Sequence, residues 1–333
     1  MISIAADGLD VLTCGEAMVL FVARECGPLE QVGAFDRAAA GAELNVATGL
    51  ARLGLRAGYL TRLGDDCFGR YLAGCLRREG IVGIATAPDA AHPTGFMLKG
   101  RRDDGGDPDI EYHRRGSAAS HLGLSDLTTH CVDRARCVHL TGITPALSAS
   151  TRELVFEIAR RAREAGRLVV FDPNLRPRLW PSQAEMVACI NDLAGLADIV
   201  LPGLAEGRLL TGRDDPAAIA DFYRARGARG VAVKLGARGA LCVDASGAIA
   251  VDGVLAPRVV DTVGAGDGFA VGVISGLLEG LTLPHAARRG CVIGARVVQF
   301  PGDSDGLPTR AQLADELARA ESIADRAVLQ DRP

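Results

Sequence analysis

Lysine is scarce in this sequence: only Lys99 and Lys234 occur among 333 residues, so arginine supplies almost all of the positive charge. This bias predicts that pairs such as Arg160-Arg161 lie on solvated helix surfaces. A net charge of −4 and an isoelectric point near 5.9 offer no basic surface of the kind that nucleic acids select. Nucleic acid is therefore not an expected partner.

Other signals are absent as well. No apolar run approaches the roughly 18 residues that a membrane span requires, and the first residues lack the basic segment and long apolar core of a signal peptide. The nine cysteines form no C-x-x-C pair, and the six histidines form no H-E-x-x-H. We therefore expect a cytoplasmic protein with reduced thiols, no membrane association and no zinc site.

Apolar strands alternate with amphipathic helices along most of the chain, which is the pattern of a parallel sheet covered by helices on both faces. No internal repeat interrupts this order, and residues 1–333 are predicted to form one α/β domain. The predicted strands are 10–15, 59–63, 81–86, 137–141, 168–172, 199–201 and 231–235, and the predicted helices begin near 41, 64, 151, 183, 266, 284 and 309.

The alternation is broken between residues 93 and 120. Two short extended runs, 94–99 and 109–114, flank a polar hairpin-like turn at 101–108, and no helix separates them. Together with residues of about 16–35, the stretch 93–118 is predicted to form a small sheet that projects from the α/β body as a lid.

The stretch Asp261-Thr-Val-Gly-Ala-Gly-Asp-Gly-Phe-Ala-Val-Gly272 carries the clearest chemical pattern. Apolar residues at helical spacing follow it, so Gly264, Ala265 and Gly266 fall on the turn that opens a helix. Small residues there leave backbone N–H groups uncovered, and the helix dipole favours an anion such as a phosphate. Asp267 is then placed to take a proton from a nucleophile that attacks this phosphate. A Gly-rich turn with an ordinary first-turn carboxylate is the alternative.

Three further stretches lie at predicted strand ends or in the lid. Lys234-Leu-Gly-Ala-Arg-Gly239 offers bare backbone to a nucleotide, although it lacks the Walker spacing and also suits a plain strand-to-hairpin turn. Asp172-Pro-Asn-Leu-Arg176 brings Arg176 within reach of phosphate oxygens, unless Arg176 is one more surface arginine. Tyr112 and Arg114 share one face of a strand and suit a small hydroxylated acid, with a polar edge strand as the alternative.

In combination, these stretches resemble the ribokinase-like (PfkB) sugar kinases, whose signature D-T-x-G-A-G-D is present as Asp261-Thr-Val-Gly-Ala-Gly-Asp267. The resemblance covers residues of about 10–310, and it extends to the family members that phosphorylate 2-dehydro-3-deoxy-D-gluconate. The other motifs that carry it are Gly41-Ala-Glu-Leu-Asn45, Ala51-Arg-Leu-Gly54, Arg62-Leu-Gly-Asp-Asp-Cys-Phe-Gly69, Tyr112-His-Arg-Arg-Gly-Ser-Ala-Ala-Ser120, Leu140-Thr-Gly-Ile-Thr-Pro-Ala-Leu147 and Asp172-Pro-Asn-Leu-Arg176 with Leu179-Trp180.

The resemblance implies a three-layer α/β/α sandwich with a β-sheet lid, and ATP-dependent phosphoryl transfer to the 6-hydroxyl group of a sugar acid. Asp267 would be the general base, the amides of Gly264, Ala265 and Gly266 would form the anion hole, and Mg²⁺ would be held mainly through the ATP phosphates. The implied substrate-binding residues are Gly41, Ala42, Asn45, Tyr112, Arg114 and Asp267, and the implied ATP-binding residues are Asn174, Arg176, Lys234, Gly236, Gly239, Gly264 and Gly266.

Two positions depart from the close relatives. Met97 stands where they often carry a lid tyrosine, which predicts a shifted specificity, and Cys291 stands where they carry an asparagine near the adenine, which predicts weaker nucleotide binding. Kinases of fructose, of 5-dehydro-2-deoxygluconate or of nucleosides are the nearest alternatives, and a noncatalytic sugar-acid sensor is another. A dinucleotide dehydrogenase is disfavoured because no G-x-G-x-x-G follows the first strand. By analogy with the family, we expect a homo-oligomer that pairs through the lid.

Overall fold

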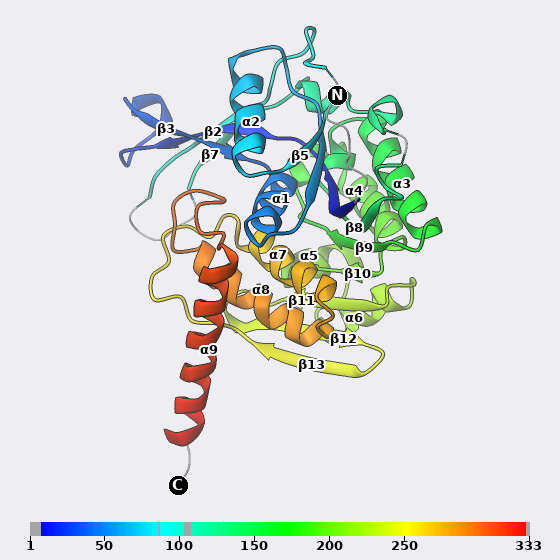
Figure 1. The fold of residues 1–333 in the computed structure, drawn as a ribbon, viewed down its shortest axis with the longest axis vertical. Helices are drawn as coiled ribbons and strands as arrows, with labels where there is room; N and C mark the ends of the chain where they lie inside the picture. Colours follow the sequence, from blue (N-terminus) through cyan, green and yellow to red (C-terminus); the bar gives the residue numbers. More distant parts are fainter. Residues whose placement is uncertain (1–7, 86, 103–107, 129, 331–333) are drawn as a thin grey trace.

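The computed structural model describes residues 8–85, 87–102, 108–128 and 130–330, and a large sheet runs through the centre of the described chain (Figure 1). Its strands are β1 (Leu9–Cys14), β4 (Ala57–Thr61), β5 (Val82–Ala85), β8 (Ala135–Thr141), β9 (Leu168–Asp172), β10 (Ile199–Val200), β11 (Gly230–Lys234), β12 (Gly239–Asp244) and β13 (Gly247–Asp252). Their order is β13-β12-β11-β10-β9-β8-β1-β4-β5. Neighbours from β11 to β5 are parallel, whereas β12 and β13 join as antiparallel strands.

Alternate residues of each strand face opposite sides of the sheet, and both sides are apolar. Leu12 and Val138 belong to one core, while their neighbours Val11 and Cys137 belong to the other. The first core is covered by α3 (Ala149–Glu164), α4 (Gln183–Ala194), α5 (Leu204–Thr211) and α6 (Pro216–Arg224). The second is covered by α1 (Ala42–Arg52), α2 (Cys67–Arg78), α7 (Ala265–Leu278), α8 (Leu283–Val297) and α9 (Arg310–Gln330). The predicted three-layer α/β/α arrangement is confirmed.

The small second sheet consists of β2 (Met18–Ala23), β3 (Phe35–Ala40), β6 (Phe96–Lys99) and β7 (Ile110–His113), in the order β3-β2-β6-β7. The pair β2–β6 is parallel, and the two outer pairs are antiparallel. This sheet projects from one side of the body, as Figure 1 shows. The strand β3 continues to residue 40, beyond the predicted limit near 35, and residues 103–107 of the predicted turn lie outside the described residues.

Small residues let α7 and α8 pack at very short range. A Cβ atom added at Gly272 would lie 2.3 Å from the backbone nitrogen of Gly290, so a side chain there would force the two helices apart. Residues Asp267 to Gly276 of α7 are all buried. The helix is therefore anchored along most of its length, which fixes the position of its first turn.

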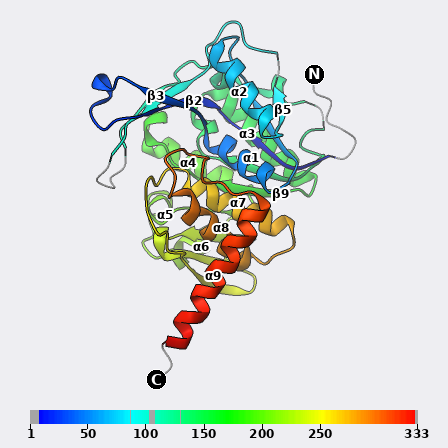
Figure 2. The ribbon, with the colours of Figure 1, turned by 60° about the vertical axis from the view of Figure 1, so that its left-hand side comes forward.

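The C-terminal helix α9 extends away from the body, on a different side from the small sheet (Figure 2). Its first turn is attached by Arg310, which donates a 2.9 Å hydrogen bond to the carbonyl of Leu53 and pairs with Glu279. In the part of the chain that the structure describes, none of the helices is both long and apolar enough to cross a membrane.

Candidate active site

The strand β1 lies between β4 and β8. The next strands in the chain, β4 and β5, extend the sheet to one edge, and the later strands from β8 to β13 extend it to the other edge. Ligands of open α/β sheets bind in the crevice that opens at the carboxyl ends of the strands near such a point. A cavity of about 280 Å³ lies there, between the strand ends and the small sheet. It is lined by Met18, Gly41, Ala42, Asn45, Met97, Ile110, Tyr112, Arg114, Ile143, Asp172, Asn174, Arg176, Glu206, Lys234, Thr262, Val263, Gly264, Gly266, Asp267 and Asp303.

Two helices begin at this cavity, and both begin at a glycine in a conformation that other residues avoid. Gly41 precedes α1 with φ 139°, and an added Cβ atom would lie 2.4 Å from the carbonyl oxygen of Glu16. Gly264 precedes α7 with φ 85°, and its added Cβ atom would lie 2.4 Å from the carbonyl oxygen of Asp303. Both helix N-termini therefore present partial positive charge to one space.

Asp267 stands in the first turn of α7 and is 8% exposed. Its Oδ2 accepts a 2.8 Å hydrogen bond from Nδ2 of Asn45, and its Oδ1 accepts a longer one, 3.4 Å, from Nδ2 of Asn174. Burial raises the pKa of the Asp267 carboxyl to about 7, against the opposing effect of the Asn45 hydrogen bond. A carboxylate whose pKa lies near neutrality is suited to accept a proton from a hydroxyl group.

The turn before Asp267 has the geometry of an anion site. Gly264 and Gly266 both line the cavity, and the amides of a first helical turn have no carbonyl partner within their helix. Ala265 does not line the cavity, and its amide lies 3.4 Å from the carbonyl oxygen of Thr262. The amides of Gly264 and Gly266 are thus better placed for a phosphoryl oxygen than that of Ala265.

Basic and amide side chains gather on the strand-end side of Asp267. Nζ of Lys234, at the end of β11, lies 2.7 Å from Oδ2 of Asp172, at the end of β9. Burial raises the pKa of Asp172 to about 6, although Lys234 opposes the shift, so this pair is ionised at neutral pH. Asn174 and Arg176 follow β9 and also line the cavity, and Asn174 adopts the left-handed φ of 39°.

The opposite side of the cavity is formed by the small sheet. Met97 of β6 pairs in register with Tyr112 of β7, and both residues line the cavity. The Arg114 guanidinium lies 5.7 Å from the centre of the Tyr112 ring. It is already paired inside the protein, because its Nε donates a 2.6 Å hydrogen bond to Oε2 of the buried Glu16.

Besides Ala265, three residues named in the sequence analysis do not line this cavity. Gly236 and Gly239 do not line it, and an added Cβ atom at Gly239, which has φ 96°, would lie 2.0 Å from the carbonyl oxygen of Val251. The turn into the β12–β13 hairpin therefore requires a glycine here, and a nucleotide contact of its backbone stays a prediction. Cys291 lies on α8, where burial raises the pKa of its thiol to about 11. Its effect on nucleotide binding stays a prediction.

Several cavity residues had no sequence signal. Glu206, near the start of α5, accepts hydrogen bonds from the backbone nitrogens of Leu175 and Gly203, and so holds the loop that carries Arg176. Glu16 and Asp303 join the site from segments that carry no chemical motif. Asp303 lines the cavity, whereas Glu16 does not line it but binds the cavity residue Arg114. Only the folded chain brings Glu16 to Arg114 and Asp303 to Lys99, because these partners lie 98 and 204 positions away in the sequence.

The described residues contain no group of three or more His, Cys, Asp or Glu side chains that could hold a metal ion by themselves. A Mg²⁺ ion that arrives with ATP would need few side-chain ligands, since Mg²⁺ often keeps waters and substrate phosphates as ligands.

Comparison with known proteins first defines the class. The model of the pfkB family carbohydrate kinases matches residues 9–310. The solved PfkB protein from Polaromonas sp. JS666 superposes with a TM-score of 0.85 at 52% identity, over 92% of this chain and 99% of that chain. A putative ribokinase II from E. coli, solved with ATP and Mg²⁺, superposes with a TM-score of 0.85 over 93% of this chain and 99% of that chain, and at 24% identity it supports the fold alone.

A second comparison gives a relative whose name states its substrate. The 2-dehydro-3-deoxygluconokinase of Bacillus subtilis (strain 168) is 48% identical over 316 residues, which cover 95% of this chain and 97% of that protein. The chain therefore belongs to the pfkB family of carbohydrate kinases. The predicted class is confirmed: it is an ATP-dependent phosphotransferase that acts on an alcohol group of a sugar.

Proposed function

We propose that this enzyme phosphorylates the 6-hydroxyl group of 2-dehydro-3-deoxy-D-gluconate with ATP as the donor. The observation that carries the proposal is the buried Asp267, which lies between the lid residues on one side of the cavity and the strand-end basic residues on the other. The similarity to the Bacillus subtilis enzyme supports the choice of this sugar acid.

In this proposal the acceptor hydroxyl group lies against Asp267, which removes its proton as the oxygen attacks the γ-phosphorus of ATP; the bond from that phosphorus to the β–γ bridging oxygen breaks, and ADP leaves. The amides of Gly264 and Gly266 stabilise the charge on the transferring phosphoryl group, with the amide of Ala265 as a further donor. Such a donor typically contributes about 3 kcal/mol to lowering the barrier. Mg²⁺, when bound with ATP, neutralises charge on the phosphates.

The sugar acid would be held by residues from the start of α1 and from the small sheet. Gly41, Ala42 and Asn45 line the cavity at the acceptor side, with Tyr112 and Arg114 opposite them. Glu16 faces Nε and Nη2 of Arg114, so among the contacts of the described residues Nη1 is the nitrogen that is left to meet the substrate carboxylate. Glu16 therefore orients the guanidinium, but it also removes its net charge.

ATP would extend over the strand ends. Asn174, Arg176 and Lys234 line that side of the cavity and would meet the phosphates, while Gly236 and Gly239 would lie along the rest of the nucleotide. The neutralisation of Lys234 by Asp172 implies that Arg176, always charged, is the stronger phosphate contact.

One observation favours a neutral sugar as the acceptor instead. Because Glu16 already neutralises Arg114, a ketose such as fructose would leave no buried charge without a partner. A sugar kinase of this second kind would show little discrimination between the acid and its neutral analogues.

The test is a coupled assay of ADP formation with a matched panel of acceptors: 2-dehydro-3-deoxy-D-gluconate, 5-dehydro-2-deoxy-D-gluconate, fructose and adenosine. We expect kcat/KM to be at least about tenfold higher for the first acid than for any other acceptor, which corresponds to 1.4 kcal/mol. Phosphorus NMR of the product should place the phosphate on C6. An equal or higher kcat/KM for fructose rejects the sugar-acid assignment. If no acceptor gives ADP formation, the protein is a noncatalytic sensor and the proposed function is rejected.

Three further properties belong to the same proposal. Residues 1–333 act as one catalytic domain, because both sheets line one cavity. The nine cysteines are all unpaired, which suits the reducing cytoplasm.

Copies of the chain pair through the small sheet, whose outer strands β3 and β7 have unpaired edges within the described residues. Light scattering after size-exclusion chromatography checks the pairing, and a monomer at micromolar concentration contradicts it.

A further inference from the structure

Lys99 lies in the protein interior, where lysine is rare. It ends strand β6 of the small sheet, and it is 1% exposed. Its ammonium group donates a 2.8 Å hydrogen bond to Oδ1 of Asp303 and a 3.4 Å hydrogen bond to the carbonyl of Pro301, and it also forms an ion pair with Asp261. A buried ammonium is strongly disfavoured unless it is paired in this way.

The partners of Lys99 flank the turn that forms the anion site. Asp261 begins the segment 261–267, and the backbone nitrogens of Val260 and Asp261 both lie within hydrogen-bond distance of the carbonyl of Val298, at 2.7 and 3.2 Å. Asp303 lies against the other end of the turn, where its carbonyl oxygen would be 2.4 Å from a Cβ atom on Gly264. The ammonium therefore joins the two segments between which the turn 262–266 is held.

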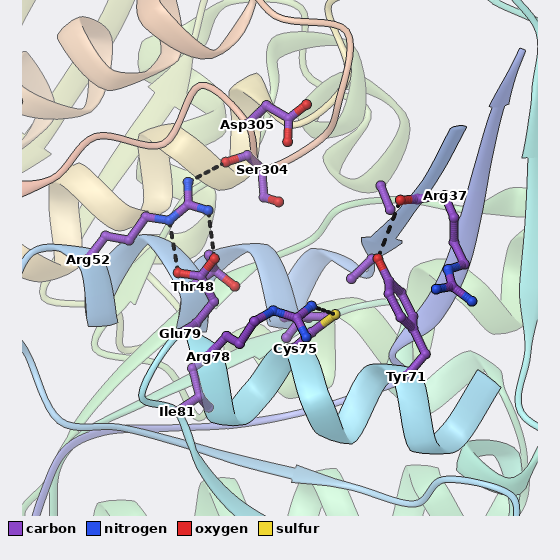
Figure 3. A pocket seen from close by; sticks show the side chains of 13 residues that line it. Arg37, Thr48, Arg52, Tyr71, Cys75, Arg78, Glu79, Ile81, Ser304 and Asp305 are labelled. Atoms are coloured by element: carbon purple, nitrogen blue, oxygen red, sulfur yellow. Dashed lines mark hydrogen bonds and ion pairs between the residues drawn. The ribbon is translucent and has the colours of Figure 1, made fainter. Parts of the chain in front are cut away.

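The loop that carries Asp303 is supported from its far side by Arg52. Nη1 of Arg52 donates hydrogen bonds of 2.8 and 3.1 Å to the carbonyls of Ser304 and Leu307. Figure 3 shows this guanidinium between Glu79 and the carbonyl of Ser304, in a separate hollow of about 210 Å³. Arg52 thus fixes the outer face of the loop, and Lys99 fixes its inner face.

Lys99 is also mechanically linked to the acceptor side of the cavity. Met97 lies two residues earlier on β6, so the side chains of Met97 and Lys99 point to the same face of the strand. Met97 lines the cavity and pairs in register with Tyr112, whereas Lys99 does not line the cavity. Movement of β6 toward or away from a bound sugar would therefore move the ammonium relative to Asp261 and Asp303.

The charges at this junction are not balanced within the described residues. One ammonium serves two buried carboxylates, and burial raises the pKa of Asp303 although Lys99 opposes the shift. Without the ammonium, Asp261 and Asp303 would repel each other across the base of the turn. Removal of Lys99 should therefore displace these segments instead of leaving them in place.

We propose that Lys99 is a positioning residue for phosphoryl transfer: its ammonium group, carried by the small sheet, holds Asp261 and the Asp303 loop together, and so sets the geometry of the amides at Gly264 and Gly266. This inference rests on the proposed function of the same turn. The rival is a purely structural ion cluster, which would lower stability without a selective effect on turnover.

The main test compares Lys99→Met with the wild-type enzyme well below the melting temperature of both. Methionine keeps an unbranched apolar side chain that reaches the position of Cε, but it lacks the ammonium group. We expect kcat to fall about 100-fold, the effect of roughly 1 Å of misplacement, with KM for ATP and for the sugar acid within about threefold of wild type. A kcat within about threefold of wild type, or a change confined to KM, overturns the proposal.

The matched control is Arg62→Met, which also removes a cation from a buried carboxylate. Nη2 of Arg62 lies 2.8 Å from Oδ1 of Asp126, and neither residue lines the cavity. We expect it to lower the melting temperature while kcat stays within about twofold of wild type. An equal loss of kcat in both variants would identify a general effect of lost stability and overturn the proposal.

Chemical rescue provides a readout that a structural role would not give. Lys99→Ala leaves space for a small cation, so methylammonium chloride should restore kcat at least about fivefold relative to equal sodium chloride, and it should not do so for Lys99→Met. If methylammonium changes kcat equally in Lys99→Ala and Lys99→Met, or in neither, the result contradicts a positioning role of the ammonium group. If either single variant does not fold, the addition of Asp303→Asn, which removes one of the two carboxylates, provides a folded background for the same comparison.

A second measurement is independent of the substrate. Hydrogen exchange followed by mass spectrometry should show about tenfold faster exchange of the segment 260–268 in Lys99→Met, with α3 unchanged. Unchanged exchange in that segment overturns the proposal. If the wild-type enzyme phosphorylates none of the sugar acids, the proposed function fails. The role of Lys99 is then still decided by the exchange result and by the ratio of kcat between Lys99→Met and the wild-type enzyme on any sugar that is accepted.

Discussion

Asn45 donates a 2.8 Å hydrogen bond from Nδ2 to Oδ2 of Asp267, although 222 positions separate the two residues in the sequence. The bond joins the first turns of α1 and α7, so the acceptor side and the phosphoryl side of the cavity are held in a fixed relation. It also favours the ionised form of Asp267 and thereby limits the rise of its pKa.

The pH dependence of the reaction should report this carboxyl group. Since the pKa of Asp267 is about 7 and the base must be ionised, kcat/KM should fall about tenfold per pH unit below pH 7 and level off above it. Initial rates between pH 5 and 9 check this expectation. Asn45→Ala removes the hydrogen bond and should move the midpoint to higher pH, whereas a profile that is flat down to pH 5 would exclude Asp267 as the base.

Asp267→Asn should separate activity from stability. The variant should lose at least about 100-fold in kcat, because amide oxygen is a poor base. A carboxyl group whose pKa is raised from about 3.9 in the unfolded chain to about 7 in the folded protein destabilises the fold increasingly as pH rises between these values. The variant should therefore be more stable than wild type at pH 8, by about 1 to 4 kcal/mol.

Urea unfolding of Asp267→Asn at pH 8 and pH 5 checks the sign of this effect. The gain should be largest at pH 8 and shrink toward pH 5, where Asp267 is mostly protonated in the folded protein. A variant that is less stable than wild type at both pH values would mean that the ionised carboxylate is well compensated in the fold.

Gly264→Ala and Gly280→Ala form a matched pair. The two glycines have nearly equal φ angles, 85° and 86°, so both substitutions carry the same backbone strain of about 1 to 2 kcal/mol. Only Gly264 also has an atom in the way, the carbonyl oxygen of Asp303 at 2.4 Å, whereas nothing lies within 4 Å of an added Cβ atom at Gly280. Gly264→Ala should therefore be more destabilising by a further 1 to 3 kcal/mol or so, and it should lower kcat.

Denaturant unfolding and initial rates measure both effects for this pair. Gly280→Ala should keep kcat within about twofold of wild type, because Gly280 follows the C-terminal end of α7, at the opposite end of the helix from its first turn. Equal stability losses in the two variants would contradict the close packing of the Asp303 loop on Gly264.

The double variant Arg114→Met with Glu16→Gln tests the recognition of the substrate acid. Arg114→Met alone would leave Glu16 as an unpaired buried charge, at a cost of about 3 to 5 kcal/mol, so both charges are removed together. If Nη1 of Arg114 binds the carboxylate, KM for the sugar acid should rise roughly 10- to 100-fold. KM for a weakly accepted neutral sugar serves as the control and should change less than about threefold, and equal changes for both substrates would rule out carboxylate recognition at this position.

Local patterns were sufficient to predict much of the fold. The apolar runs of β8, β9 and β11 and the Gly-rich start of α7 each carry their own signal, and the structure has them within two residues of the predicted positions. Two helices were missed. The signal for α6 was present, since Asp215 caps its first turn and Pro216 occupies the first helical position. The short α5 buries only Gly207 and Leu210, too few for a clear helical period.

Contacts between distant segments could not be predicted. Phe35–Ala40 has few of the residues that favour strands, and it is extended because it pairs with β2. In the site, the sequence indicates Asp267 and its turn, but it does not indicate that Glu16 would neutralise Arg114 or that Lys99 would reach Asp303, 204 positions away. These pairings follow from how the small sheet sits on the body, which no local pattern encodes.

The scarcity of lysine has a practical consequence. Of the two lysines in the chain, Lys99 is sealed inside the protein, and only Lys234, with 17% of its side chain exposed, opens on the cavity. Apart from the α-amino group, Lys234 is thus the one amine that reagents can reach in the folded protein, and they should react with it slowly because its ion pair with Asp172 raises the pKa of the ammonium group. If nucleotide binds as proposed, the rate of labelling at this single lysine should fall when the nucleotide is bound, and it would report the occupancy of the site.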